Sequence, residues 1–500
     1  MATTNDTPPE QDADMQQESE SQDKVVLFLL GIKDKIMSKE FQKQALWTIG
    51  SIILALLVSG VLIALTGNDP LLAFSSLALG AIGQLDLVMR YATPLILTGL
   101  SVALAFRCGL FNIGPEGQLY MGGIVAAIFG FMVSLPIFVH PIVCLAMGGL
   151  AGACWGFIPG ILKAYRGAHE VVTSMMLSYT AILLTQWLVT YPLKEQGPYD
   201  WISQTPRLYD TAILPPLLGS NYMHFGLIVA FLCVIGVDIL INRTVLGYEL
   251  RAVGYNEKAA EYSGINPKKN ITLAMTFAGA LAGLAGAEEI MGTYERFTDN
   301  WSGGLGWDGI TVAVLGRNNP WGVLAGAIFF GALRAGGQTM QLRADVPAEM
   351  VSVIQGLIVL FVAAPRIIDW LAKHNVGFAH WIQKKPKIAL PAYALVITNF
   401  LSILFAFGGL IDVHMTQALI LMIVAFASIG AFILTLSRRE RGPLTSLATY
   451  ILWIVAAGVG LVMATEYLLV PLIIGVIGLI MSLYIFYMAK SADFDQGGDA

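Results

Sequence analysis

Residues 45–66 have the sequence ALWTIGSIILALLVSGVLIALT, which contains no charged side chain. A helix of about 20 apolar residues crosses the hydrocarbon core of a bilayer, so this stretch predicts a membrane span. Similar stretches recur to the end of the chain, separated by short polar segments. In lipid, only helices and closed barrels satisfy every backbone polar group. The pattern therefore predicts an all-α fold, a polytopic bundle of transmembrane helices.

The composition supports a membrane protein. Of the 500 residues, 56% are hydrophobic and only 13% are charged, which lies outside the usual soluble mixture. The four cysteines show no CxxC or Cys/His spacing, so neither a disulfide framework nor a zinc site is indicated. The chain has no GxxxxGK[ST] phosphate loop, and we expect no enzyme activity, no metal and no cofactor in it. Any ATP hydrolysis is expected in a separate chain.

Basic residues predict the orientation of the spans. Four lysines precede the first span and place the N-terminus in the cytoplasm, because cytoplasmic loops are enriched in Lys and Arg. The loop 243–269 is the densest basic segment and is predicted to be cytoplasmic, as is the C-terminus after Lys490. Alternating the spans in this way gives about twelve full crossings.

Two apolar stretches do not fit a simple crossing. Residues 71–85 are Gly-rich and close to the next span, which favours a helix at the outer interface. Residues 309–316 are too short to cross, and the next full span, 347–364, must run inward. Residues 309–336 are therefore predicted to form a re-entrant pair of half-helices that starts and finishes outside. Such irregular backbone is tolerated where it lines a cavity.

The expected domain organisation has five parts. They are a disordered acidic tail with a basic juxtamembrane segment (1–44), a transmembrane domain (45–370), a basic linker (371–387), an appended four-helix transmembrane module of unknown role (388–490) and a C-terminal tail (491–500).

Residues 107–120, RCGLFNIGPEGQLY, form the first motif. Glycines and Pro115 break the helix among the polar groups of Asn112, Glu116 and Gln118, and so expose backbone polar groups between two apolar helices. Transporters build paths for polar solutes from such surfaces. A plain cytoplasmic turn explains the same residues equally well.

Residues 246–264, LGYELRAVGYNEKAAEYSG, form the second motif. Asn256 is a predicted N-cap, Glu257 lies in the first turn, and Gly264 is a C-terminal stop. A helix of two turns cannot bury a core, so we expect it to dock on a partner. The alternative is a solvated loop that only fixes the topology.

Two acidic residues near the outer end of a predicted span, Glu288 and Glu289, also allow several interpretations. They are suited to a proton relay, but snorkelling to the interface or contact with a solute-binding protein accounts for them as well.

Four runs resemble the ribose and nucleoside (branched-chain amino acid-like) branch of ABC transporter permeases, in its nucleoside-uptake subgroup. They are 103–123 (ALAFRCGLFNIGPEGQLYMGG), 246–265, 303–331 and 363–365. The resemblance covers residues 45–370 and excludes the four terminal spans. It departs at His169 and Ser178, where Asn is expected.

The resemblance implies roles for two sets of residues. The translocation path is expected at Phe111, Asn112, Glu116, Gln118, Asn318 and Asn319. The coupling helix that enters a cleft of the ATPase is expected at Arg251, Asn256, Glu257, Ala260, Glu261 and Gly264.

The resemblance also implies partners and a location. They are an ABC ATPase subunit with two cassettes, a second related permease, a lipid-anchored solute-binding protein, a nucleoside substrate and membrane lipid, with no nucleic acid. The expected location is the bacterial cell membrane. A permease for ribose or another simple sugar is the first alternative. An ion-coupled secondary transporter is the second, but it would bury ionisable residues in mid-span, whereas most charges here fall at predicted span ends.

Overall fold

A computed structural model of the protein describes residues 39–373, apart from 198–200, 218, 221 and 348. The chain divides into two compact units, Met1–Val362 and Ala363–Ala500. Most of the predicted N-terminal tail and linker lies outside the described residues, as do all of the predicted module 388–490 and the tail 491–500.

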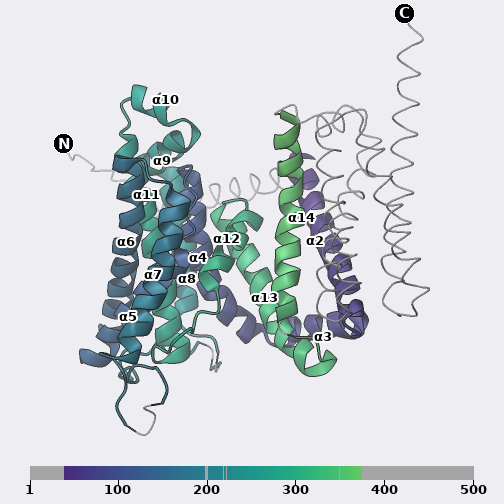
Figure 1. The fold of residues 1–500 in the computed structure, drawn as a ribbon, viewed down its shortest axis with the longest axis horizontal. Helices are drawn as coiled ribbons and strands as arrows, with labels where there is room; N and C mark the ends of the chain where they lie inside the picture. Colours follow the sequence, from purple (N-terminus) through teal and green to yellow (C-terminus); the bar gives the residue numbers. More distant parts are fainter. Residues whose placement is uncertain (1–38, 198–200, 218, 221, 348, 374–500) are drawn as a thin grey trace, which may run out of the picture. The chain divides into compact units, whose positions relative to one another are not determined.

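The described part of the chain is helical, and its only sheet-like pairings are two isolated bridges (Figure 1). The elements are α2 (Lys39–Leu65), α3 (Pro70–Gly83), α4 (Leu85–Arg107), α5 (Pro115–Met132), α6 (His140–Arg166), α7 (Glu170–Thr190), α8 (Gly226–Arg243), α9 (Val245–Tyr255), α10 (Glu257–Tyr262), α11 (Pro267–Glu289), the π-helix η1 (Ile290–Tyr294), α12 (Leu305–Leu315), α13 (Pro320–Ala344) and α14 (Glu349–Lys373). The all-α prediction is confirmed.

Five helices of the described residues are long and apolar enough to cross a membrane. They are α4, α6, α7, α8 and α11, the last of which continues into η1. Each corresponds to a span that the sequence predicts. The predicted spans 45–66, 115–134 and 347–364 form as α2, α5 and α14, which are not among these five, and the terminal group lies outside the described residues. The total of about twelve spans therefore stays a prediction.

Helix boundaries follow local signals in the sequence. Pro115 occupies the first turn of α5, where its missing N–H is harmless. Gly167 ends α6 in the left-handed conformation, with φ of 66°, and Lys163 and Arg166 precede it in the last turn. Asn266 caps α11 by accepting a hydrogen bond from the Lys269 N–H at 3.2 Å.

Helix α11 packs on α4, α5 and α6, and small residues allow the closest of these contacts. A Cβ added at Gly279 would overlap the carbonyl oxygen of Gly152 on α6, and one added at Gly283 would meet the Gly148 carbonyl. Small residues are common at such interfaces in membranes because they let two helix backbones approach closely.

The prediction of two half-helices agrees with the structure for the length of the first helix and not for that of the second. Helix α12 is short, with 11 residues, but α13 has 25 residues and is about 37 Å long. The polar residues in the second half of α13 find partners on other helices. Arg334 pairs with Asp308 at 2.6 Å, and Gln338 donates a hydrogen bond to the Tyr91 hydroxyl at 2.6 Å. These residues do not end the helix, so the half-length prediction is wrong for α13.

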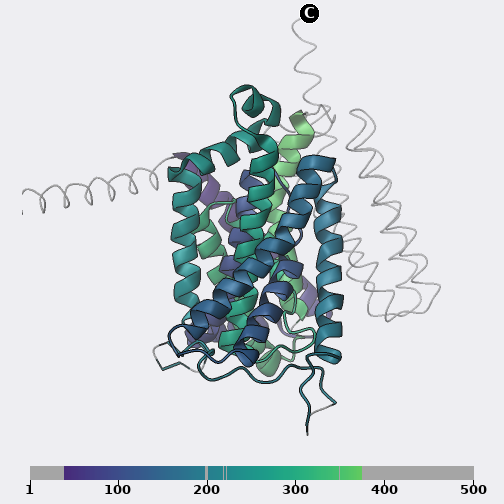
Figure 2. The same ribbon diagram turned by 90° about the vertical axis from the view of Figure 1, so that its left-hand side faces the viewer.

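The two ends of the first unit carry different structures. Helices α9 and α10 lie at one end, and the segment 191–225 between α7 and α8 lies at the opposite end (Figures 1 and 2). Helix α3 forms where the interfacial helix is predicted and packs closely on α13. Its interfacial placement stays a prediction.

Candidate translocation and coupling sites

The loop between α4 and α5 is closed by its own side chains. Asn112 is fully buried, and its Oδ1 accepts a hydrogen bond from the Gly114 N–H at 2.9 Å. Its Nδ2 donates to Gln118 Oε1 at 3.3 Å, and Gln118 is 1% exposed. These amides hold the turn together and face protein instead of solvent.

Glu116 joins the same loop to α12. Its carboxylate is buried, and Oε2 accepts a hydrogen bond from the Gly306 N–H at 2.7 Å. That N–H belongs to the first turn of α12, which has no intrahelical acceptor for it. A carboxylate also suits the positive end of a helix dipole. Glu116 therefore caps α12 from another helix.

Two serines of α7 contact the loop from the other side. Ser174 Oγ accepts from the Ile113 N–H at 3.2 Å, and Ser178 Oγ accepts from the Gly117 N–H at 3.3 Å. The departure at Ser178 from the family pattern thus places a small hydroxyl where it bonds the backbone of α5. The loop is the point at which α4, α5, α7 and α12 are tied together.

The other predicted path residues lie apart from this network. Phe111 is 42% exposed, and its ring lies 4.9 Å from that of Phe106. Asn318 has φ of 56° in the turn before α13, and its carbonyl accepts from Arg107 Nε at 2.9 Å. Asn319 caps α13 by accepting from the Trp321 N–H at 3.0 Å. The path role of all six residues stays a prediction.

The predicted coupling segment folds as two helices. The Asn256 side chain accepts from the Ala259 N–H at 3.1 Å, and Gly264 takes a φ of 83°, as the cap and stop signals predict. Ala260 is 3% exposed and packs into the core of its own unit. Part of the surface that the sequence assigns to a partner is therefore covered by this chain.

The remaining surface of α10 is open. Tyr255, just before it, is 89% exposed, and Tyr262, at its end, is 94% exposed. Glu257 and Glu261 line a shallow surface pocket with Gly264. Arg251 points back to its own helix, donating from Nε to the Gly247 carbonyl at 3.3 Å. Two exposed aromatic rings, one at the end of α9 and one at the end of the six-residue α10, are typical of a protein contact.

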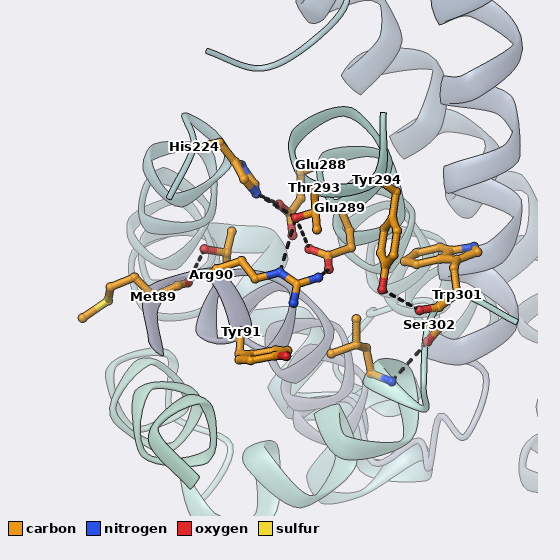
Figure 3. A network of polar contacts seen from close by, with 12 residues as sticks. Met89, Arg90, Tyr91, His224, Glu288, Glu289, Thr293, Tyr294, Trp301 and Ser302 are labelled. Atoms are coloured by element: carbon orange, nitrogen blue, oxygen red, sulfur yellow. Dashed lines mark hydrogen bonds and ion pairs between the residues drawn. The ribbon is translucent and has the colours of Figure 1, made fainter. Parts of the chain in front are cut away.

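At the opposite end of the unit, ionisable side chains are buried together (Figure 3). Arg90 of α4 donates from Nη2 to Glu289 Oε1 at 2.7 Å. Glu289 Oε2 accepts from Thr293 at 3.2 Å. Glu288 and Glu289 are 0% and 1% exposed, so snorkelling to the interface, one interpretation of these residues, is wrong. We call Arg90, His224, Glu288, Glu289 and Thr293 the buried charge cluster.

Glu288 is the least satisfied member of the cluster. Neither of its carboxylate oxygens has a hydrogen-bond partner among the described residues. His224 Nε2 lies 3.7 Å from Glu288 Oε2 and 3.4 Å from the Thr293 hydroxyl. Buried ionisable groups are costly in a membrane bundle and commonly mark functional sites.

The geometry of His224 argues against a metal at the cluster, although one ligand atom each from His224, Glu288 and Glu289 lies within 4.8 Å of the others. The Gly226 N–H donates to His224 Nδ1 at 3.2 Å, so the neutral ring carries its proton on Nε2. Burial and the nearby Arg90 guanidinium lower the pKa of His224 to about 4, which keeps the ring neutral. Its Nε2 therefore faces the carboxylates as a donor.

Sequence reasoning missed the cluster, but a signal was present. Arg90 lies early in an inward span, and Glu288 and Glu289 lie late in an outward one, so the topology places all three at the same side. Opposite charges at equal depth in two spans predict a pair.

Together, the spans and the buried polar contacts within the bundle define a multi-pass membrane protein. Residues 84–363 match the family described as "branched-chain amino acid transport system / permease component". The chain belongs to this family, and it is the permease component of an ABC transport system, which implies an ATPase and a substrate-binding protein as partners.

Several relatives are similar over most of their length. The guanosine ABC transporter permease protein NupP of Bacillus subtilis is 38% identical over 64% of this chain and 93% of its own. The glucose ABC transporter permease protein TsgB13 of Haloferax volcanii is 34% identical over 66% and 89%. The nucleoside ABC transporter permease protein NupB of Lactococcus lactis is 33% identical over 64% and 90%. No solved structure matches the chain.

Proposed function

We propose that this chain is the permease subunit of an ABC importer for nucleosides in a bacterial cell membrane. The observation that carries the proposal is the 38% identity to a guanosine permease over 93% of that protein. A second relative at 33% identity is named for nucleosides. The family match, residues 84–363, contains the loop of Asn112, Glu116 and Gln118 and the helices α9 and α10.

In this proposal, α9 and α10 couple the bundle to an ATPase with two cassettes. Helix α10 has six residues and is too short to be stable alone. Ala260 anchors it to the bundle, while Tyr255 and Tyr262 face outward. The basic loop that contains these helices is cytoplasmic, and both termini lie on that side. Helix α10 is then fixed to the bundle on one face and bound to the ATPase on the other, so movement of the ATPase is transmitted to the bundle.

The translocation path runs beside the loop between α4 and α5 and is completed by a second, related permease. Asn112, Glu116 and Gln118 position the loop, since they are buried. A lipid-anchored binding protein delivers the solute at the opposite end from α10. Alternating access then moves α7 and α12, both bonded to that loop, relative to the second permease.

A sugar importer is the second candidate, because a glucose permease is 34% identical over 89% of its length. An ion-coupled carrier is the candidate of another class. The buried charge cluster is the observation in its favour, although the cluster lies at the ends of α8 and α11 and not in mid-span.

The test is uptake by cells that express this chain with and without its partners. Labelled guanosine and labelled ribose are supplied to cells with the complete system, with an ATPase whose phosphate-loop Lys is replaced, and with a protonophore. We expect guanosine uptake that the ATPase variant abolishes. Uptake of ribose alone would favour the sugar importer, and uptake that survives the ATPase variant but not the protonophore would favour the ion-coupled carrier.

A further inference from the structure

Two aromatic rings lie next to the residues that tie α7 and α12 to the loop between α4 and α5. The Tyr179 and Trp307 ring centroids are 6.4 Å apart and tilted by 42°. Tyr179 is 51% exposed and Trp307 is half-buried. Tyr179 follows Ser178, whose hydroxyl accepts a hydrogen bond from the backbone of α5, and Trp307 follows Gly306, whose N–H donates to Glu116. Each ring therefore lies next to a residue that is hydrogen-bonded to the loop or to α5.

This arrangement fixes the backbone beneath both rings. Gly117 packs so closely on α7 that an added Cβ would meet the Ser178 Cα at 2.5 Å. An added Cβ at Gly306 would overlap the backbone of Glu116. Glu116 thus holds the backbone beside Trp307, and Ser178 holds the backbone beside Tyr179, while both rings stay at least partly accessible.

A charged pair lies next to Trp307 along α12. Asp308 follows Trp307 and accepts from Arg334 Nη2 at 2.6 Å, with the two side chains 22% and 21% exposed. Arg334 also donates to the Gly303 carbonyl at 3.3 Å. One oxygen of the Asp308 carboxylate is therefore paired with Arg334. The other oxygen can accept a hydrogen bond from a ligand, because the side chain is partly exposed.

A nucleoside matches this combination of groups. Its base is flat and stacks on aromatic rings whatever its identity, and its N–H and hydroxyl groups donate hydrogen bonds to a carboxylate. We propose that Trp307 and Tyr179 bind the base of the solute as it passes, and that Asp308 accepts a hydrogen bond from it. The inference rests on the proposed nucleoside function and names the contact surface within it.

The same chain offers a matched control. Trp321 of α13 lies 6.1 Å from Phe231 and is 47% exposed. Its ring is also a tryptophan paired with another aromatic ring, and it is more exposed than Trp307, but it does not follow a residue that is hydrogen-bonded to the loop. Trp321→Leu therefore measures how much uptake and labelling change when an exposed aromatic pair is lost while the proposed contact with the base is kept.

The experiment uses the complete transporter in proteoliposomes with its ATPase, second permease and binding protein. Guanosine carrying a photoreactive azide on the base is irradiated during ATP hydrolysis, and labelled peptides are identified by mass spectrometry. We expect labels on the peptides that contain Tyr179 or Trp307, suppressed by excess guanosine and not by ribose. Trp307→Leu should lower labelling and guanosine uptake about tenfold, Trp307→Phe should retain most of both, and Trp321→Leu should match the parent protein.

Four outcomes would overturn the inference. Guanosine uptake with no label on either peptide, or equal uptake and labelling in Trp307→Leu and Trp321→Leu, would reject the contact surface and leave the nucleoside function standing. Loss of the co-purifying second permease in Trp307→Leu would assign the ring to a subunit interface. If the parent protein does not transport guanosine, the nucleoside function fails, and the proposed contact fails with it.

Discussion

Helix α10 (Figure 1) precedes the start of α11, whereas the buried charge cluster (Figure 3) includes the end of α11, and the two are stabilised in different ways. Helix α10 is held by a side-chain cap and one buried alanine, and most of its surface is exposed. The cluster has almost no exposed surface and depends on charge pairing between α4 and α11. Substitutions at the cluster should therefore damage the bundle, whereas substitutions in α10 should damage only the contact with a partner.

The largest effect is expected from Arg90→Leu. The change leaves Glu289 without its charged partner at 2.7 Å, beside Glu288, which has no hydrogen-bond partner among the described residues. Removing one member of a buried pair costs about 3–5 kcal/mol, because the other charge stays buried and uncompensated. We expect the variant to accumulate poorly in membranes and to unfold at a clearly lower temperature in detergent, measured by fluorescence-detected size exclusion after heating.

Arg207→Leu is the matched control for that change. Arg207 makes a similar 2.8 Å contact with Glu295, but both side chains are well exposed, at 51% and 38%. Exposed pairs contribute little to stability because water screens them. Equal unfolding temperatures for the two variants would mean that burial of the Arg90 pair does not matter.

The next effect is expected from Ala260→Pro, which should spare the bundle and abolish uptake. The Ala260 N–H donates to the Asn256 carbonyl at 3.0 Å, and proline removes this bond and clashes with the preceding turn. The local cost is about 3 kcal/mol or more. We expect normal levels in the membrane, with no co-purification of the ATPase and no stimulation of its activity.

Val245→Pro is the control for Ala260→Pro. Val245 is the first residue of α9, where proline is tolerated, and the preceding Thr244 is extended, with φ of −111° and ψ of 157°. It should transport normally. Normal uptake by Ala260→Pro as well would show that the segment only fixes the topology.

Local features of α10 and of the helices that begin near it could be predicted from the sequence. Asn256 and Gly264 signal the start and the stop of α10 through their own backbone chemistry, and the structure has both. The starts of α5 and α11 follow from prolines in the same way. These signals act within a few residues, so one sequence suffices to find them.

Contacts between distant residues could not be predicted from local signals. Glu116 bonds to Gly306, 190 residues away, and Arg334 and Gln338 are satisfied by other helices, which is why α13 runs past its predicted end. A hydropathy profile treats a charged residue as the end of a span, whether or not a residue on another helix pairs with that charge. The burial of Glu288 was missed for the same reason.

A smaller effect is expected at Glu116, whose carboxylate caps α12. Glu116→Ala leaves the Gly306 N–H buried without an acceptor, at a cost of about 1–3 kcal/mol. Glu116→Gln keeps an acceptor oxygen and should retain most uptake. Because α12 carries Trp307, we expect guanosine uptake to fall in the alanine variant. The comparison is uptake per transporter in membranes, and equal values for the two variants would remove the capping role.

The smallest effect is expected from Asn256→Ala, which removes the cap of α10. Loss of a capping side chain costs about 1 kcal/mol, a change of about fivefold in an equilibrium constant. Because α10 has only six residues, this cost falls on a helix with few other contacts, and ATPase stimulation should drop a few-fold.

Asn266→Ala makes the same chemical change at α11, a 23-residue helix packed on α4, α5 and α6, where the lost bond is a small part of the total. Stimulation should therefore be near normal in Asn266→Ala and reduced in Asn256→Ala, while the unfolding temperature of the bundle is unchanged in both. Equal stimulation in the two variants would show that α10 is already ordered by its contact with the bundle at Ala260, and that the exposed end gains nothing from its cap.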